Sequence, residues 1–167
     1  ARYRGAGHLA LAGASASGCG SLRAALPPSM GEALWMVHPH VVLEEAPLGP
    51  LSFERLDAVL VGPGLGPGPD PQLPGGEQVL AEPWWDPLQG FPGLLVLDAD
   101  GLNRISPAWL SQRQGPTWIT PHGGEFRRLF PDLAASPPLE AAAEAARRTG
   151  VTVLLKGARS VIATPDG

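Results

Sequence analysis

Short apolar runs alternate along this chain with polar, glycine-rich or proline-rich stretches. Residues 58–61 and 94–97 are apolar throughout, and small or acidic residues follow each run at once. Continuous apolar runs of this length, bounded by turn residues, are typical of strands buried in a parallel sheet. The pattern predicts strands over residues 21–26, 40–43, 57–61, 94–97, 117–120, 151–155 and 160–163.

The segments between these runs carry apolar residues at helical spacing. They predict helices over residues 5–17, 29–37, 108–112, 124–130 and 139–148, with shorter helical turns at 51–56 and 77–82. Ser29, with Glu32 as its capping-box partner, is predicted to cap the helix over residues 29–37. Asn103 or Ser106 is predicted to cap the helix over 108–112, and Ser136 the helix over 139–148. Gly18 and Gly150 are predicted to end helices, because glycine accepts the left-handed conformation found there.

Strands that alternate with helices indicate an α/β layered fold with a largely parallel central sheet flanked by helices. The last two strands are an exception. Only residues 156–159 separate them, and a turn that short joins antiparallel strands. No internal repeat is visible, so we expect a single domain over residues 1–167.

Composition narrows the classes of function. The chain has 167 residues and a net charge of −4, without a block of lysine and arginine, so we expect no nucleic-acid partner. No apolar run approaches the roughly 20 residues that cross a bilayer, so we expect no membrane partner. The single cysteine, Cys19, suits a reducing cytoplasm and is predicted to be a small buried residue. His8, His38 and His40 lack metal-ligand spacing and are predicted to lie on the surface or on helix faces.

Three predicted strands end in chemically distinctive loops. A glycine loop at residues 62–66 follows the first, an acidic segment at 98–103 follows the second, and residues 121–125 follow the third. In open α/β sheets, ligands bind outside the carboxyl ends of the strands. The three loops are therefore predicted to form one site.

The glycine loop matches neither common nucleotide motif. It lacks the third glycine of the dinucleotide pattern, and it lacks the lysine and hydroxyl residue of a P-loop. Its glycines allow a ligand to approach the backbone closely. A plain tight turn is the alternative interpretation.

The acidic segment offers carboxylates at alternate positions. In an extended segment Asp98 and Asp100 point to opposite sides, so one faces the site and the other caps the following turn or helix. Asn103 is also a common capping residue. Each of the two acids has a plain loop or capping role as its alternative.

Three further residues are candidates for ligand contact. His122 lies in a glycine loop at a strand end, which favours ligand contact over burial in the core. Glu125 begins a predicted helix, where the helix dipole stabilises a carboxylate, so a structural role is at least as well supported as a catalytic one. Lys156 is the only lysine beside eleven arginines. Its compact ammonium suits phosphate, and a solvated turn residue is the alternative.

Four segments in this order resemble the NAD(P)H-hydrate dehydratase family, a branch of the ribokinase-like superfamily. Residues 61–66 are similar to the family's VGPGLG loop, 97–103 to LDADALN, 120–126 to TPHPGEF, and 155–161 to LKGxxT, with Ser160 where threonine is usual. Residues 3–6 resemble its YPGA element more faintly. Together the matches span nearly the whole chain.

The resemblance implies a ribokinase-like fold and the repair of hydrated NADH or NADPH. ADP, or ATP, with Mg²⁺ would phosphorylate the ring hydroxyl of the (S)-hydrate, and elimination would restore the dihydropyridine. It implies substrate contacts at Ala6, Gly64, Gly66 and His122. It implies nucleotide contacts at Lys156, Gly157, Ala158, Arg159 and Ser160. A phosphate or Mg²⁺ edge would comprise Asp98, Asp100, Asn103 and Glu125.

Two family features fall outside these residues. In the family a first strand precedes the YPGA element, and a GxGD motif follows the position where the chain ends. That motif supplies an anion hole at a helix N-terminus and the aspartate proposed as base. We therefore expect a fold that is incomplete at both ends, a catalytic base beyond Gly167, and no turnover from these residues alone.

Two other functions stay open. One is a small-molecule kinase of the same fold, of the hydroxyethylthiazole or hydroxymethylpyrimidine type, and the other is a non-catalytic nucleotide-binding module. The resemblance further implies small-molecule nucleotide partners, a cytoplasmic location and a homo-oligomer, for which the apolar residues 34–36 would serve. It also allows fusion to an NAD(P)H-hydrate epimerase domain.

Overall fold

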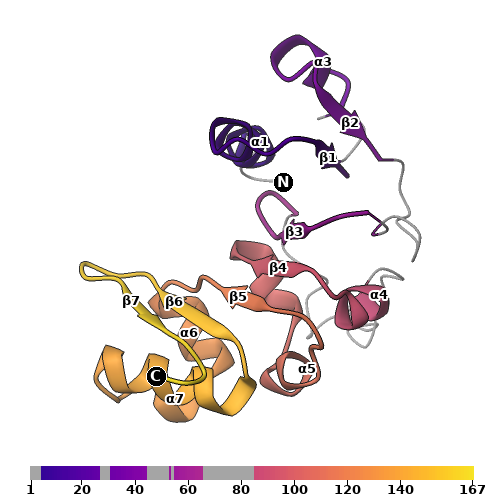
Figure 1. Cartoon of the computed structure of the whole chain (residues 1–167). Coiled ribbons are helices and arrows are strands. Elements are labelled where there is room, and N and C mark those ends of the chain that lie inside the picture. The colour runs from indigo at the N-terminus through magenta and orange to yellow at the C-terminus, as the bar shows by residue number, and fades with distance from the viewer. Residues whose placement is uncertain (1–4, 27–30, 45–52, 54, 66–84) are drawn as a thin grey trace, which may run out of the picture.

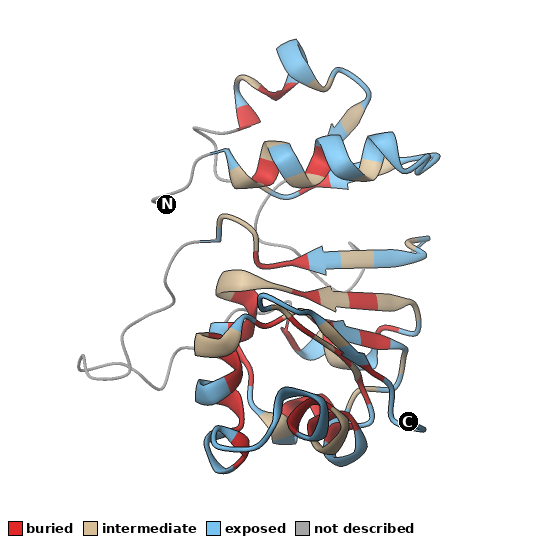
Figure 2. Ribbon diagram, turned by 90° about the vertical axis from the view of Figure 1, so that its left-hand side faces the viewer, coloured by how far each residue is buried: buried red, intermediate tan, exposed pale blue. Residues whose placement is uncertain are grey.

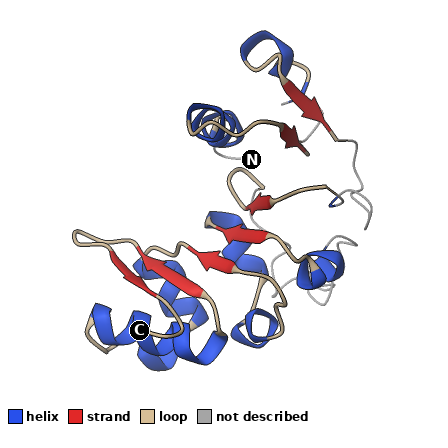
Figure 3. Ribbon diagram, viewed as in Figure 1, coloured by secondary structure: helices blue, strands red, loops and turns tan. Residues whose placement is uncertain are grey.

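The computed structural model describes residues 5–26, 31–44, 53, 55–65 and 85–167. They form two β-sheets with flanking helices (Figures 1 and 3). The strands are β1 (Leu22–Ala24), β2 (Val41–Leu43), β3 (Ala58–Val61), β4 (Leu94–Leu97), β5 (Thr117–Ile119), β6 (Thr152–Leu155) and β7 (Val161–Ala163). The helices are α1 (Ala6–Ala16), α3 (Leu34–Val37), α4 (Trp85–Gly90), α5 (Pro107–Ser111), α6 (Gly123–Leu129) and α7 (Pro138–Thr149), with 3₁₀ helices η3 (Ala99–Arg104) and η4 (Pro131–Leu133).

The larger sheet has the strand order β3-β4-β5-β6-β7. Its first four strands run parallel, and β7 pairs antiparallel with β6, as the short connection between them predicts. One row of paired residues crosses the parallel strands: Val61, Leu97, Ile119 and Val153. The carboxyl ends of these strands therefore meet at one edge of the sheet.

The core of this sheet lies between the strands and the helices that cover it. In β4, Leu95 and Leu97 are fully buried, whereas Leu94 and Val96, which alternate with them, are only half-buried. The alanine face of α7 packs on β6 and β7. Burial of each large aliphatic side chain contributes about 1.5–3 kcal/mol to folding. This packing makes the parallel strands a rigid support for the loops at their carboxyl ends.

Residues 5–26 and 31–44 form a smaller layer beside the larger sheet. β1 and β2 pair in parallel, and α1 and α3 pack on them. The buried hydrophobic side chains described in this layer are those of Leu11, Ala24 and Leu34, with Leu26 and Val41 packed against them. In Figure 2 the smaller layer is mostly exposed, whereas the buried residues are concentrated in the larger sheet and the helices that cover it. Within α3, Leu34 is buried, but Trp35 and Met36 are exposed.

The predicted strands are confirmed wherever the structure describes them, within one or two residues at their ends. The predicted end of α7 is also confirmed, because Gly150 adopts a left-handed conformation with φ 71°. Ser106, one of two predicted caps, begins α5: its Oγ accepts a hydrogen bond from the Trp109 N–H at 3.2 Å. None of the described helices is long and apolar enough to cross a membrane.

The predictions for Ser136 and Cys19 are wrong. α7 has Pro137 as its N-cap, and no side chain caps it, because Pro138 at the first helical position is already preset for helical φ and needs no N–H partner. Ser136 therefore does not cap this helix. Cys19 is exposed, not buried, because it follows the turn that ends α1. Asn103, the alternative to Ser106 as the cap of α5, lies within η3.

Some predictions fall on residues outside the described part of the chain. These are the cap at Ser29, residue Gly66, half of the helical turn at 51–56, and the whole helical turn at 77–82.

Candidate functional site

Hydrogen bonds join the loops at the carboxyl edge of the sheet into one continuous surface. The Asp98 N–H donates to the Val61 carbonyl at 3.1 Å, which links the end of β4 to the end of β3. The Thr120 N–H donates to Leu97 at 3.0 Å, and the Lys156 N–H donates to Pro121 at 2.8 Å. The ladder thus continues past the last residue of each strand, so the side chains that follow are held in register.

The glycine turn after β3 is packed against the acidic loop after β4. Gly62 has φ +130°, and a Cβ at this position would lie 1.7 Å from the Asp98 carbonyl oxygen. A Cβ on Gly101 would lie 2.6 Å from the Val61 carbonyl oxygen. At Gly62, the group that approaches the glycine backbone closely is therefore the acidic loop of the same chain. Gly64, with φ +81°, continues the turn at a half-buried position.

Asp98 and Lys156 form an ion pair across the edge. The Lys156 Nζ lies 2.6 Å from the Asp98 Oδ1, although 58 residues separate them in sequence. The two side chains keep 39% and 30% of their surface exposed, for Lys156 and Asp98 respectively, so solutes can reach the pair. The Thr120 hydroxyl, which follows β5, donates to the Leu97 carbonyl at 3.5 Å and also stabilises the charged carboxylate of Asp98.

The charge state of Asp98 follows from these contacts. Burial by itself would raise the pKa of Asp98, because it disfavours the charged carboxylate. Hydrogen bonds from Lys156, Thr120 and the Ala99 backbone, with the positive charge of Lys156, together outweigh burial and hold the pKa below its ordinary value. At neutral pH the edge therefore carries a carboxylate and an ammonium in contact.

His122 and Glu125 cap the start of α6. The His122 Nδ1 accepts hydrogen bonds from the Gly124 N–H at 2.9 Å and the Glu125 N–H at 3.4 Å. The Glu125 carboxylate accepts from the His122 N–H at 2.8 Å, which completes a capping box. Because Nδ1 accepts, a neutral imidazole here carries its proton on Nε2. This explains the buried position of Glu125, for which a structural role was predicted as one alternative.

Asp100 and Asn103 lie in η3, not in an extended segment. The prediction that Asp98 and Asp100 alternate as in a strand is therefore wrong: Asp98 is extended, and the 3₁₀ turn begins at Ala99 with φ 47°. The Arg128 guanidinium donates to the Leu102 carbonyl and so fixes η3 to α6. Burial lowers the pKa of Arg128, and the nearby charge of Glu125 acts in the opposite direction.

The structure thus brings Asp98, His122, Lys156 and the turn at Gly64 to one edge. The rest of the predicted nucleotide segment, Gly157 to Ser160, forms the exposed turn between β6 and β7. Ala6 is the first residue of α1, in the smaller layer. Sequence reasoning missed Thr120, which follows β5 directly and whose place after a strand was the available signal.

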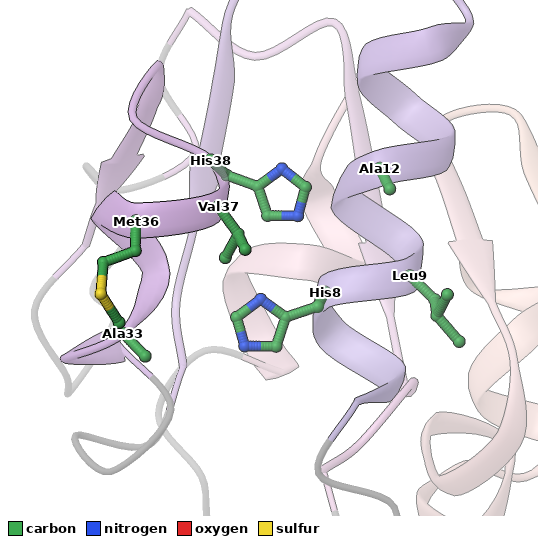
Figure 4. A pocket seen from close by; sticks show the side chains of 7 residues that line it. All are labelled: His8, Leu9, Ala12, Ala33, Met36, Val37 and His38. Carbon is green, nitrogen blue, oxygen red and sulfur yellow. The ribbon is translucent and has the colours of Figure 1, made fainter.

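Sequence reasoning also did not foresee that three histidines gather in the smaller layer. The rings of His8 and His38 stack with centroids 5.9 Å apart, and His40 lies edge-on to His38 at 6.1 Å. A pocket of about 480 Å³ between α1 and α3 is lined by His8 and His38 together with apolar side chains (Figure 4). Among the described residues, no group of three histidine, cysteine, aspartate or glutamate side chains has the geometry of a metal site.

Comparison with known structures first defines the class. The chain superposes on a ribokinase-like superfamily protein from Enterococcus faecalis with a TM-score of 0.70 and 21% identity, covering 98% of this chain and 56% of that one. It superposes on an ADP/ATP-dependent NAD(P)H-hydrate dehydratase from Bacillus subtilis, co-crystallized with ATP/Mg²⁺, with a TM-score of 0.72 and 29% identity, covering 99% and 59%. The fold is therefore ribokinase-like, as predicted.

The family follows from the sequence match. The model of the NAD(P)H-hydrate dehydratase family matches residues 1–167, so the chain belongs to that family. The bifunctional NAD(P)H-hydrate repair enzyme Nnr of Gloeobacter violaceus is 41% identical over 177 residues, covering 99% of this chain and 33% of that protein. The chain therefore spans about a third of the length of the curated relatives it matches.

Proposed function

We propose that this chain takes part in the nucleotide-dependent dehydration of hydrated NADH or NADPH. A phosphoryl group from ADP or ATP is transferred to the ring hydroxyl of the hydrate. Cleavage of the C–O bond then releases phosphate, and loss of a ring proton restores the dihydropyridine. Phosphorylation is needed because hydroxide is a poor leaving group and phosphate is a good one.

One observation carries the proposal. Three of the four family segments lie at one edge of the sheet, and the described part of the fourth, 61–65, joins them through the Gly62 turn. Lys156 is 2.6 Å from Asp98 and pairs with His122 in an isolated parallel bridge. A reaction between two bound substrates needs the binding segments to lie close together, because catalysis of phosphoryl transfer depends mainly on positioning and charge stabilisation. Family membership and the relatives' names support the same reaction.

Each residue has a proposed role at this edge. The Lys156 ammonium and the turn from Gly157 to Ser160 would meet the phosphates of the nucleotide. The exposed side chain of His122, and Gly64 in its turn, would meet the hydrated nicotinamide. Ala6 and Gly66 complete the proposed substrate contacts.

In the proposed reaction, Mg²⁺ binds together with the nucleotide. This ion usually binds one or two carboxylates together with phosphate oxygens and water, so it does not need a ready-made cage of protein ligands. Asp100 lies in η3 next to the edge and would hold it, with Asn103 nearby. When bound, Mg²⁺ offsets the charge of the phosphoryl group that is transferred.

The test is the absorbance band of the dihydronicotinamide, measured on the product of the complete reading frame. Hydrated NADH is supplied with ADP, then with ATP, then without nucleotide. We expect the band to return only with nucleotide, and the preferred donor to be the one that restores it faster. Substitution of Lys156 by Met should abolish most of the rate, whereas Glu44→Gln, in an ion pair of the smaller layer, should leave it unchanged.

A folded protein that binds ADP without restoring the band would contradict the proposal. A panel of hydroxyethylthiazole and hydroxymethylpyrimidine substrates would then test the kinase alternative, and binding without any turnover would identify a nucleotide-binding module. The relatives are named as bifunctional repair enzymes, which supports a second activity in the complete protein. A cytoplasmic location and a homo-oligomer remain predictions, and sedimentation of the purified protein tests the latter.

A further inference from the structure

We propose that Asp98 is a positioning residue that holds the Lys156 ammonium at the carboxyl edge, and that it is not a ligand of Mg²⁺. The inference deepens the proposed function and rests on it, because it assigns the two charges of the edge to different tasks. Lys156 would meet the phosphates, and Asp98 would act through Lys156.

The first argument is that the Asp98 carboxylate is already surrounded by donors. It accepts a hydrogen bond from the Lys156 Nζ at 2.6 Å, and Thr120 and the Ala99 backbone also stabilise its negative charge. The charge of this carboxylate is therefore already offset by groups of the chain itself. A divalent cation on the same group would sit close to an ammonium, and two positive charges at that distance repel each other.

The second argument is that both ends of the pair are fixed by backbone. The Asp98 N–H is bonded to Val61 and the Lys156 N–H to Pro121, each as an extension of the sheet ladder. The part of Lys156 that the backbone does not fix is its long, flexible side chain. The Asp98 carboxylate holds the ammonium at the end of that side chain. Within the described part of the chain, Asp98 is the side chain that accepts from Nζ, so the ammonium keeps other N–H groups for a phosphate.

The third argument concerns the balance of charge. The Asp98 carboxylate repels a nucleotide polyphosphate, so its presence is not explained by affinity for nucleotide. Orientation does explain it, since a displacement of about 1 Å at a reacting group costs about a hundredfold in rate. Loss of the carboxylate should therefore lower kcat without weakening the binding of nucleotide.

The experiment is a double-mutant cycle of Asp98→Asn and Lys156→Met in the complete protein. Measured quantities are kcat, the Kd for ADP by calorimetry, and the Mg²⁺ concentration for half-maximal rate. We expect Asp98→Asn to lower kcat about ten- to a hundredfold, with ADP bound as tightly as before or more tightly and the Mg²⁺ dependence unchanged. Lys156→Met should lower kcat and weaken ADP binding, and adding Asp98→Asn to it should cause no further loss.

A matched control comes from the smaller layer. Arg23 and Glu44 form an ion pair at 2.9 Å with side chains 39% and 25% exposed, close to the values for Lys156 and Asp98. Glu44→Gln removes one carboxylate from that pair, and kcat, Kd and Mg²⁺ dependence should all stay at the wild-type values. Thr120→Val provides a second variant, because it removes one donor from Asp98 and keeps its charge. It should lower kcat several-fold, and only when Lys156 is present.

A readout without turnover separates this inference from the proposed function. The chain has one lysine, so ¹⁵N-lysine labelling gives an ammonium signal that Lys156→Met identifies by its loss. We expect slow exchange with water in the wild type and fast exchange in Asp98→Asn. Fast exchange in the wild type, a higher Mg²⁺ requirement in Asp98→Asn, or independent effects in the cycle would overturn the inference. Failure of the wild type to repair the hydrate would instead count against the proposed function.

Discussion

At the scale of single residues, Gly62 is the position where the site tolerates least change. An added Cβ would overlap the Asp98 carbonyl oxygen at 1.7 Å, and φ +130° is unfavourable for any L side chain. We expect Gly62→Ala to lower the free energy of unfolding by roughly 3 kcal/mol or more. Urea denaturation measures this change.

The same substitution in α1 is the control. Gly13 lies within the helix, and a Cβ there would meet nothing within 4 Å. Because alanine is the better helix former, Gly13→Ala should raise stability by about 0.5–1 kcal/mol. Equal effects of the two substitutions would contradict the interlocked packing of Gly62 with the acidic loop.

At the scale of elements, His122 caps α6 and is also proposed to contact the substrate. It caps this helix through Nδ1, its Nε2 lies 3.5 Å from the Glu125 Oε1, and its side chain is 62% exposed. We expect His122→Ala to cost about 1 kcal/mol of stability through loss of the cap. Asparagine is a good N-cap residue, so His122→Asn should keep stability within about 0.5 kcal/mol of the wild type. Urea denaturation compares the two variants.

The two variants also separate capping from binding. If Nε2 contacts the hydrated substrate, both should raise KM for it to a similar extent, whatever their stability. A KM that rises only in His122→Ala would mean that His122 acts through the shape of α6 and does not contact the substrate. The helix cap would then be its whole contribution.

At the scale of the whole molecule, the two layers differ in how much apolar surface holds them. The larger sheet has an extensive core that includes Leu95, Leu97 and Ile119 at 0% exposure, whereas the buried residues of the smaller layer are Leu11, Ala24 and Leu34. Local opening requires least free energy where few apolar contacts are broken. We expect hydrogen exchange of backbone amides to be slowest in β4, β5 and β6, and measurably faster in β1, β2 and α1. Mass spectrometry of peptic fragments measures this, and equal protection in both layers would indicate one cooperative unit.

The sequence by itself was sufficient to predict what depends on near neighbours in the chain. Apolar runs located β4 and β6, the short connection predicted the β6–β7 hairpin, and Gly150 marked the end of α7. These features follow from burial of consecutive residues and from local backbone preferences. Recognition of the loops after β3, β4 and β5 as one edge followed in turn, because parallel strands end on the same side, whereas the turn after β6 was assigned to the site through the family resemblance.

Only the tertiary structure decided which groups of that edge touch one another. The pairing of Lys156 with Asp98, the contact of Thr120 with the same carboxylate, and the packing of Gly62 on the acidic loop join residues that lie far apart in the sequence. Such contacts depend on strand register and on the direction of each side chain, and a shift of one residue would turn every side chain of a strand to the other face. A sequence pattern identifies the strands and their loops, but the partner of each charge is determined by the packing of the whole sheet.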